Sequence, residues 1–153
     1  YLLRETFSIK IFLFILVICI FTDLGGYIFG KLFKGPKLTK LSPKKTYAGV
    51  VGSFILSLVS ATMYTKLTAI YNINNLNSSI WSDKNLLSDN IFLFILLISF
   101  ISQVGDLIIS YFKRSAKVKD TGSLLPGHGG LLDRIDGVIF VIPISYLLLI
   151  YLK

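Results

Sequence analysis

The sequence predicts an all-α, polytopic membrane protein with about four transmembrane helices and two basic cytoplasmic loops. Of its 153 residues, 54% are hydrophobic, and the mean hydropathy is +0.73, whereas soluble domains use roughly 45–50% apolar residues. The apolar residues gather in four runs, which cover residues 7–30, 47–70, 90–112 and 135–152. Each run approaches the ~20 residues that a helix needs to cross a bilayer. The runs largely lack the polar face of a surface helix, so we expect four membrane helices.

The connectors between these runs differ in charge. The first, residues 31–46, carries six lysines and no acid, and the third, residues 113–134, is also basic. The second, residues 71–89, is rich in Asn and Ser and is not basic. If all four runs cross the membrane, the first and third connectors lie on the same side, and the positive-inside rule places them in the cytoplasm. We therefore expect an integral protein of the cell (inner or plasma) membrane.

Small residues predict where the helices touch. They recur every fourth position in the second run, at Gly49, Ser53, Ser57 and Ala61, and Gly26 and Gly30 have the same spacing in the first. Small residues at this spacing let membrane helices approach closely. The hydroxyl of Ser42 or Thr46 is a candidate cap for the second helix.

Acidic residues inside the apolar runs are candidates for function. Asp23 lies in the first run and Asp106 in the third, and an acid near mid-bilayer costs about 2.5–3.5 kcal/mol on insertion scales. Asp133 and Asp136 open the last run, and their spacing of three places them on one face of a helix. These acids are either functional or simply paired with nearby Lys and Arg, as structural ion pairs are.

The acids alternate with bases on one predicted helix face. If the third run continues as a helix, Asp106, Lys113, Lys117 and Asp120, spaced by 7, 4 and 3 residues, share that face. Carboxylates supply the hard oxygen ligands that Mg²⁺ prefers, and lysines hold phosphate charge. The pattern favours a magnesium–phosphate site at a membrane face.

Residues 122–130 read Gly-Ser-Leu-Leu-Pro-Gly-His-Gly-Gly and are typical of a turn. Their glycines allow backbone N–H groups to approach a phosphate, although such clusters are usually plain turns. His128 is the single histidine of the chain, so a zinc site of the His/Cys type is excluded.

Residues 110–136 read Ser-Tyr-Phe-Lys-Arg-Ser-Ala-Lys-Val-Lys-Asp-Thr-Gly-Ser-Leu-Leu-Pro-Gly-His-Gly-Gly-Leu-Leu-Asp-Arg-Ile-Asp. This segment resembles the signature of the phosphatidate cytidylyltransferase (CDP-diacylglycerol synthase) family. A block upstream of this segment also resembles the family. It departs at two positions, because Gly26 stands where the family has a small Ala and Ala48 stands where the family has Glu. The missing carboxylate at Ala48 means that no role of that Glu carries over. The positions that match in the signature are Ser110, Lys113, Arg114, Lys119, Asp120, Pro126, His128, Gly129, Gly130, Asp133, Arg134 and Asp136.

The resemblance implies an enzyme that transfers the CMP moiety of CTP to phosphatidic acid, with release of pyrophosphate and with its active site facing the cytoplasm. It implies Mg²⁺ as the cofactor, and a second, monovalent ion stays open. The implied metal ligands are Asp106, Asp133 and Asp136, and these act in catalysis together with Lys113 and Arg114. The implied substrate-binding residues are Asp23, Lys44, Lys45, Lys117, Asp120, His128 and Arg134.

Residues 1–153 are expected to form one transmembrane catalytic domain with its motif core at 106–136, as the C-terminal part of a longer chain. The partners implied are CTP, phosphatidic acid and the bilayer, with no nucleic acid, and a homodimer stays open. Three alternatives remain: a CTP-dependent kinase of a polyprenol or phytol-type alcohol, a non-enzymatic membrane transporter, and an inactive portion that needs an upstream half. The first would have to activate a neutral hydroxyl and would release CDP.

Overall fold

The computed structural model describes residues 9–38, 45–72, 91–118 and 132–151, apart from the side chains of residues 69–72 and 132–134. These residues form helices α2 (Ile9–Phe33), α3 (Tyr47–Asn72), α4 (Ile91–Ser115) and α5 (Leu132–Tyr151). The all-α fold is confirmed, and each helix begins and ends within three residues of its apolar run. By length and composition, α2, α3 and α4 can each cross a membrane, while the apolar part of α5, Ile135–Tyr151, is shorter.

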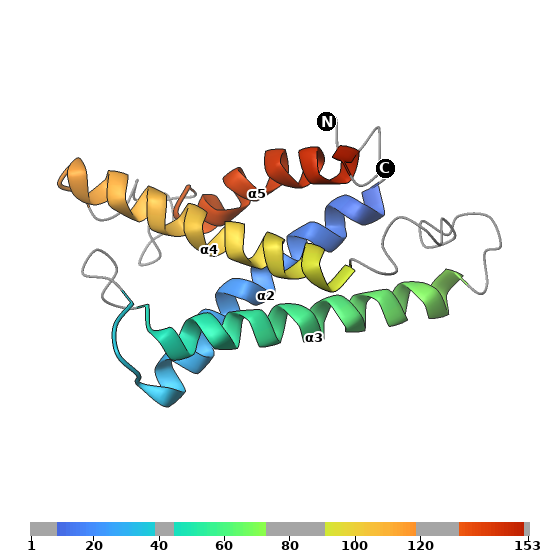
Figure 1. Ribbon diagram of the computed structural model, residues 1–153, viewed down its shortest axis with the longest axis horizontal. Helices are drawn as coiled ribbons and strands as arrows, with labels where there is room; N and C mark the ends of the chain where they lie inside the picture. The colour runs from blue at the N-terminus through green and yellow to red at the C-terminus, as the bar shows by residue number, and fades with distance from the viewer. Residues whose placement is uncertain (1–8, 39–44, 73–90, 119–131, 152–153) are drawn as a thin grey trace.

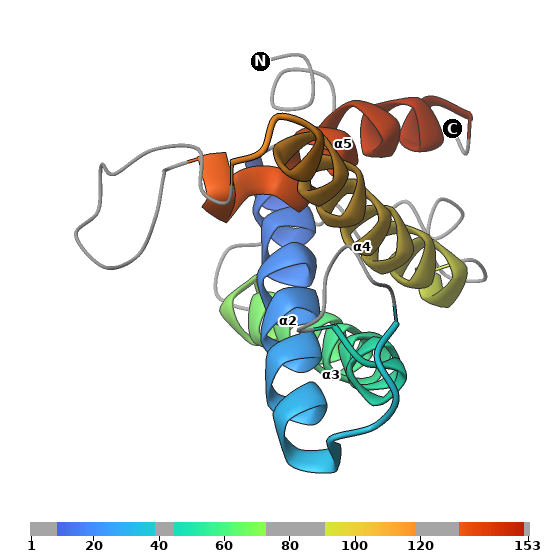
Figure 2. The same ribbon diagram turned by 90° about the vertical axis from the view of Figure 1, so that its left-hand side faces the viewer.

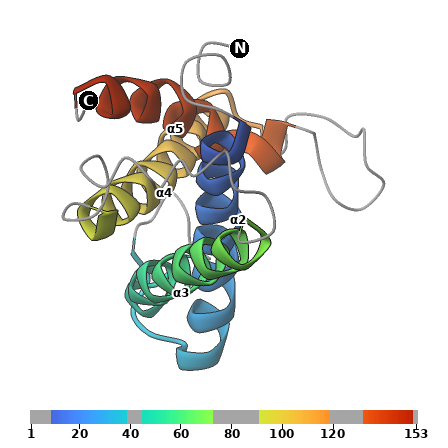
Figure 3. The ribbon, with the colours of Figure 1, turned by 90° about the vertical axis from the view of Figure 1, so that its right-hand side faces the viewer.

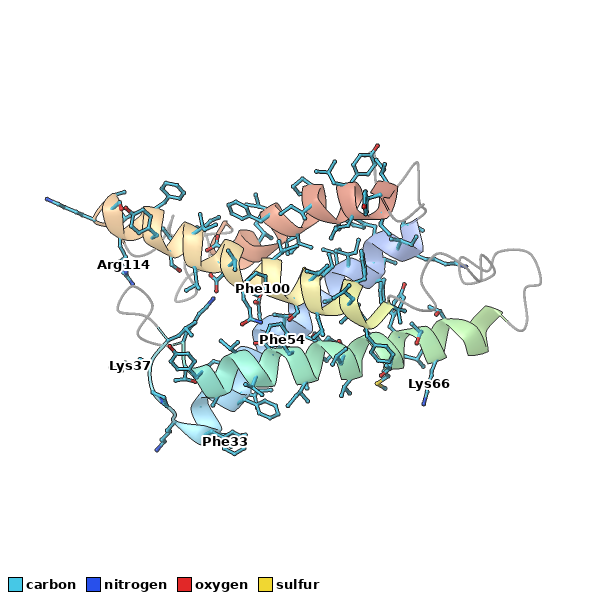
Figure 4. All side chains as sticks on the ribbon, viewed as in Figure 1. Phe33, Lys37, Phe54, Lys66, Phe100 and Arg114 are labelled. Atoms are coloured by element: carbon cyan, nitrogen blue, oxygen red, sulfur yellow. The ribbon has the colours of Figure 1, made fainter. Side chains whose placement is uncertain are left out.

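The helices alternate in direction, so that the end of α2, the start of α3, the end of α4 and the start of α5 lie at one end of the bundle (Figure 1). α2 contacts each of the other three helices, and Figures 2 and 3 show it inclined steeply to α3, with α5 on the far side from α3. Lys37 and Arg114 lie at the connector end, whereas Lys66 lies near the opposite end (Figure 4). The predicted grouping of the two basic connectors is thus confirmed for their described parts, and we call this end of the bundle the basic end.

Glycines allow α2 and α3 to touch along their backbones. A Cβ atom added to Gly25 would lie 2.7 Å from the carbonyl oxygen of Gly52 and 2.8 Å from the Cα of Ser53. A Cβ atom on Gly49 would lie 2.7 Å from the carbonyl oxygen of Gly26. The predicted packing face of small residues is therefore confirmed, since no side chain larger than hydrogen fits at these crossing points.

The buried core lies where α2 packs against α4. Ile15 and Ile18 of α2 and Ile98 of α4 are fully buried. Beside them a hydrogen bond of 3.0 Å joins the hydroxyls of Thr22 and Ser99, both of which are also buried. A polar contact inside an apolar bundle satisfies both groups and fixes the register of the two helices.

The start of α3 is fixed by its connector. The Thr46 hydroxyl accepts a hydrogen bond from the Gly49 N–H at 3.1 Å, so Thr46 caps α3 as predicted. Ser42, the other candidate cap, lies outside the described residues. Lys37 and Thr46 form an isolated antiparallel bridge, and the Leu38 N–H donates to the carbonyl oxygen of Lys45 at 2.8 Å. These bonds place Lys45 directly before the first turn of α3.

The sequence predicts that the helix continues beyond α4 through Lys117 to Asp120. For Lys117 this prediction is wrong, and Asp120 lies outside the described residues. The helix ends at Ser115, and Lys117 has a left-handed backbone with φ 55°. The N–H of Val118 donates to the carbonyl oxygen of Lys113, and that of Lys117 to Arg114, each at 3.0 Å. This pair of bonds is a Schellman motif, which closes the last turn and turns the chain out of the helix axis.

The close crossing of α2 and α3 predicts a large effect for a small substitution. We expect Gly25→Ala to destabilise the protein by about 1–3 kcal/mol, because the new methyl group meets backbone atoms that must shift. This loss outweighs the gain of about 1 kcal/mol that Ala brings over Gly inside a helix. The measurement is thermal unfolding of the detergent-solubilised protein. Gly35→Ala is the matched control, since its Cβ would meet the Ala48 Cβ at an ordinary 3.5 Å. Equal melting temperatures for the two variants would contradict the tight crossing.

Candidate active site

A cavity of about 660 Å³ lies between the four helices toward the basic end. Its wall combines charged groups with apolar ones and with small hydroxyl-bearing or glycine residues. A polar site with apolar walls suits a ligand that is itself both charged and apolar. The residues that line it are Ile20, Thr22, Asp23, Leu24, Gly26, Tyr27, Lys45, Thr46, Gly49, Val50, Ser53, Gln103, Asp106, Asp136 and Gly137.

The first connector and α4 meet in an ion pair at this cavity. The Lys45 Nζ lies 2.5 Å from the Asp106 Oδ2 and donates a hydrogen bond to the main-chain carbonyl oxygen of Gln103 at 3.3 Å. The side chains of Lys45 and Asp106 are 26% and 32% exposed. Because both remain accessible, a ligand that enters the cavity can reach either partner of the pair.

A second ion pair joins α4 to α5 and is more deeply buried. The Lys113 Nζ donates to the Asp136 Oδ2 at 2.8 Å, and the Asp136 side chain is only 4% exposed. Close helix approach brings this about, since a Cβ on Gly137 would lie 2.9 Å from the Ser102 carbonyl oxygen. The glycine next to Asp136 therefore lets α5 come close enough to α4 for the carboxylate to be buried.

Three carboxylates from three different helices line one cavity. Asp23 of α2 is exposed and carries a charge near those of Asp106 and Asp136. Their oxygens are of the hard type that Mg²⁺ prefers, so the chemistry of this donor set fits the implied cofactor. Within the described ranges, no three His, Cys, Asp or Glu side chains lie close enough together to hold a metal ion. In this structure the donor oxygens of Asp106 and Asp136 each face a lysine instead.

The remaining predicted site residues fall into two groups. Arg114 and Lys117 are exposed at the end of α4 and do not line the cavity. Asp133 and Arg134 lie in the first turn of α5, but their side chains are outside the described set. The predictions for Lys44, Asp120 and His128 also lie outside the described residues.

Sequence reasoning missed Gln103 as a site residue. It lines the cavity three positions before Asp106 on the same face of α4. Thr22 and Ser53 were also missed and line the same space. The available signal was an amide inside an apolar run, one helical turn from a candidate carboxylate.

The two ion pairs differ in burial, and this predicts different costs of removing each lysine. We expect Lys113→Met to destabilise the protein by about 3–5 kcal/mol, because it leaves a buried carboxylate without its ammonium. Lys45→Met should cost about 1 kcal/mol or less, because that pair is partly open to solvent. Thermal unfolding of both variants tests the ranking. Asp136→Asn added to Lys113→Met should restore part of the loss, and the absence of any restoration would contradict the pairing.

Comparison with known proteins gives a consistent result over nearly the whole chain. Residues 1–152 match the model of the cytidylyltransferase family. The chain is 41% identical over 145 residues to a phosphatidate cytidylyltransferase of Rickettsia conorii, with 92% of this chain and 59% of that protein covered. It is 40% identical over 133 residues to one of Rickettsia typhi, with 85% and 54% covered. It is also 40% identical over 130 residues to one of Staphylococcus haemolyticus, with 84% and 45% covered.

The chain spans about half the length of the curated relatives it matches. The family match nonetheless includes all four helices, both lysine–aspartate pairs and the cavity between them. Because the match extends over residues 1–152, the chain belongs to the cytidylyltransferase family.

Proposed function

We propose that this chain is the catalytic portion of an enzyme that transfers the CMP moiety of CTP to phosphatidic acid, giving CDP-diacylglycerol and pyrophosphate for phospholipid biosynthesis. The observation that carries the proposal is the cavity between apolar helices, with one lysine–aspartate pair at its wall and a second beside it. The three relatives compared above are named phosphatidate cytidylyltransferases, which supports the choice of substrates.

The reaction needs charge neutralisation more than a strong base. An oxygen of the phosphatidate phosphate attacks the α-phosphorus of CTP, and the bond from that phosphorus to the bridging oxygen breaks. Pyrophosphate leaves with the electron pair. The attacking phosphate monoester has a second pKa of about 6, so it is largely ionised at neutral pH. The described residues that line the cavity are charged, small or apolar, which suits this chemistry.

The lysines of the two pairs would hold the phosphates of the substrates. Lys45 reaches the cavity from the first connector, and Lys113 reaches its edge from α4. Bringing two polyanions together is the main electrostatic cost of the reaction, and ammonium groups at a partly desolvated site reduce it. Arg114, Lys117, Lys44 and Arg134 would add positive charge from the basic end, and Asp23, Asp120 and His128 would complete substrate binding.

Mg²⁺ would be held by Asp106 and Asp136 together with Asp133. When bound, such an ion would supply positive charge to the phosphates and to the leaving group. For Asp106 and Asp136 to act as ligands, their lysines must turn from the carboxylates toward phosphate. Each ion pair would then supply both a carboxylate ligand for the metal ion and an ammonium group for phosphate.

The basic end would face the cytoplasm, where CTP is available. The described parts of both basic connectors lie there, and the positive-inside rule supports a cytoplasmic side for such an end in an inner or plasma membrane protein. Phosphatidic acid would stay in the bilayer with its headgroup at the cavity.

The reaction itself is tested with membranes that contain the full-length protein. We expect label from [α-³²P]CTP to enter the lipid phase only when phosphatidic acid and Mg²⁺ are present, with one pyrophosphate released per lipid labelled. A parallel reaction contains a polyprenol and [γ-³²P]CTP. Label from the γ-phosphate on the alcohol would identify a lipid kinase and refute the proposal.

The carboxylates are tested by removing one charge at a time. Asp106→Asn and Asp133→Asn should each lower kcat at least about 100-fold, because each removes a charge that would act on the reacting phosphates. Membrane insertion should be unchanged. Asp89→Asn, in the second connector, is the control and should keep wild-type turnover. Normal kcat in either site variant would remove that residue from the proposed metal site.

A further inference from the structure

Gln103 carries a buried amide nitrogen for which the described part of the chain provides no acceptor. Its Nε2 is shielded from solvent and makes no hydrogen bond there, although the residue lines the cavity. Leaving a buried N–H unpaired costs about 1–3 kcal/mol. An unsatisfied donor on a residue that lines the cavity points to an acceptor supplied by a ligand, which the amide would reach by turning toward the cavity.

The depth of Gln103 indicates which part of a ligand it meets. α4 runs toward the basic end, so Gln103 lies farther from that end than Asp106. At about 1.5 Å per residue, three residues place it roughly 4.5 Å deeper along the helix. The Lys45 ammonium, which would bind phosphate, donates to the main-chain carbonyl oxygen of Gln103 at 3.3 Å, so a group next to the phosphate can lie beside Gln103.

Beside Asp23, the α2 wall of the cavity is apolar. Ile20 and Leu24, one turn apart on α2, line the same cavity and are 54% and 44% exposed. Apolar side chains that are exposed in an apolar helix can lie against acyl chains at little cost. CTP is charged and would enter from the water-facing basic end, so the ligand at the Gln103 level is the lipid.

A diacyl lipid presents one kind of acceptor just below its phosphate, the carbonyl oxygens of its acyl esters. Resting on the function proposed above, we propose that the Gln103 Nε2–H donates a hydrogen bond to an ester carbonyl of the lipid substrate while the phosphate binds at Lys45. Gln103 would then select ester-linked lipids, because an ether oxygen at the same position is a much poorer acceptor.

The test compares diester phosphatidic acid with its diether analogue of the same chain length. For the wild-type, full-length protein we expect kcat/KM to be about tenfold higher with the diester, in line with one hydrogen bond to an otherwise unpaired buried donor. Gln103→Met keeps the length of the side chain without the N–H, so the ratio should fall to about one, with the KM for CTP unchanged. Phe100→Leu, at an exposed position one turn earlier on α4 (Figure 4), should keep the tenfold ratio.

Binding is measured in parallel as the shift of melting temperature that each lipid produces in the detergent-solubilised protein. The diester should stabilise the wild type more than the diether does, and Gln103→Met should abolish that difference. A wild-type protein that treats the two lipids alike, or a Gln103→Met variant that still distinguishes them, would overturn the inference. If no CMP enters either lipid, the proposed function fails, while the melting shifts still decide the contact. If the variant does not accumulate in membranes, the wild-type ratio and shifts decide alone.

Discussion

The structure depends on one constraint, which is that carboxylates placed among apolar helices need a cation nearby. An acid near mid-bilayer costs about 2.5–3.5 kcal/mol, and removing one partner of a buried pair is costlier still. Asp136 meets this constraint through Lys113, and Asp106 through Lys45. Each bond joins two segments far apart in the sequence, so the pairs help to determine which segments lie together. Three of the four paired side chains, Lys45, Asp106 and Asp136, line the cavity.

Close helix contact makes the pairing possible. Where Gly25 and Gly49 bring α2 against α3, the capped start of α3 holds Lys45 at the level of Asp106. On the other side, Gly137 lets α5 approach α4 near Ser102. A larger side chain at either crossing would separate backbones that now touch, and the charged groups would move apart with them. Glycines that carry no chemistry therefore position the groups that do.

The sequence predicts the helices better than it predicts the site. Apolar runs place all four helices within three residues, because length and hydropathy are local properties. The lysine that pairs with Asp106 could not be predicted from local properties. Lys45 is 61 positions earlier in the chain, and the two side chains meet only because of how the helices pack. The end of α4 was missed because a lysine, and not the usual glycine, takes the left-handed position at Lys117. The sequence shows Gln103 as an amide one helical turn before Asp106, but its lack of a hydrogen-bond partner among the described residues depends on how its neighbours pack.

The two lysine–aspartate pairs have a further consequence for the proposed reaction. Each pair is close to neutral as it stands, so the cavity wall offers a polyanion little net charge from Lys45 and Asp106 together. Binding two phosphate-bearing substrates therefore requires positive charge from elsewhere, and the basic connectors and a divalent cation are the available sources. A cation that takes over the carboxylates would release both lysines to phosphate. Under the proposed function, the same four side chains would stabilise the bundle without substrate and, once their partners change, hold the cation and the phosphates.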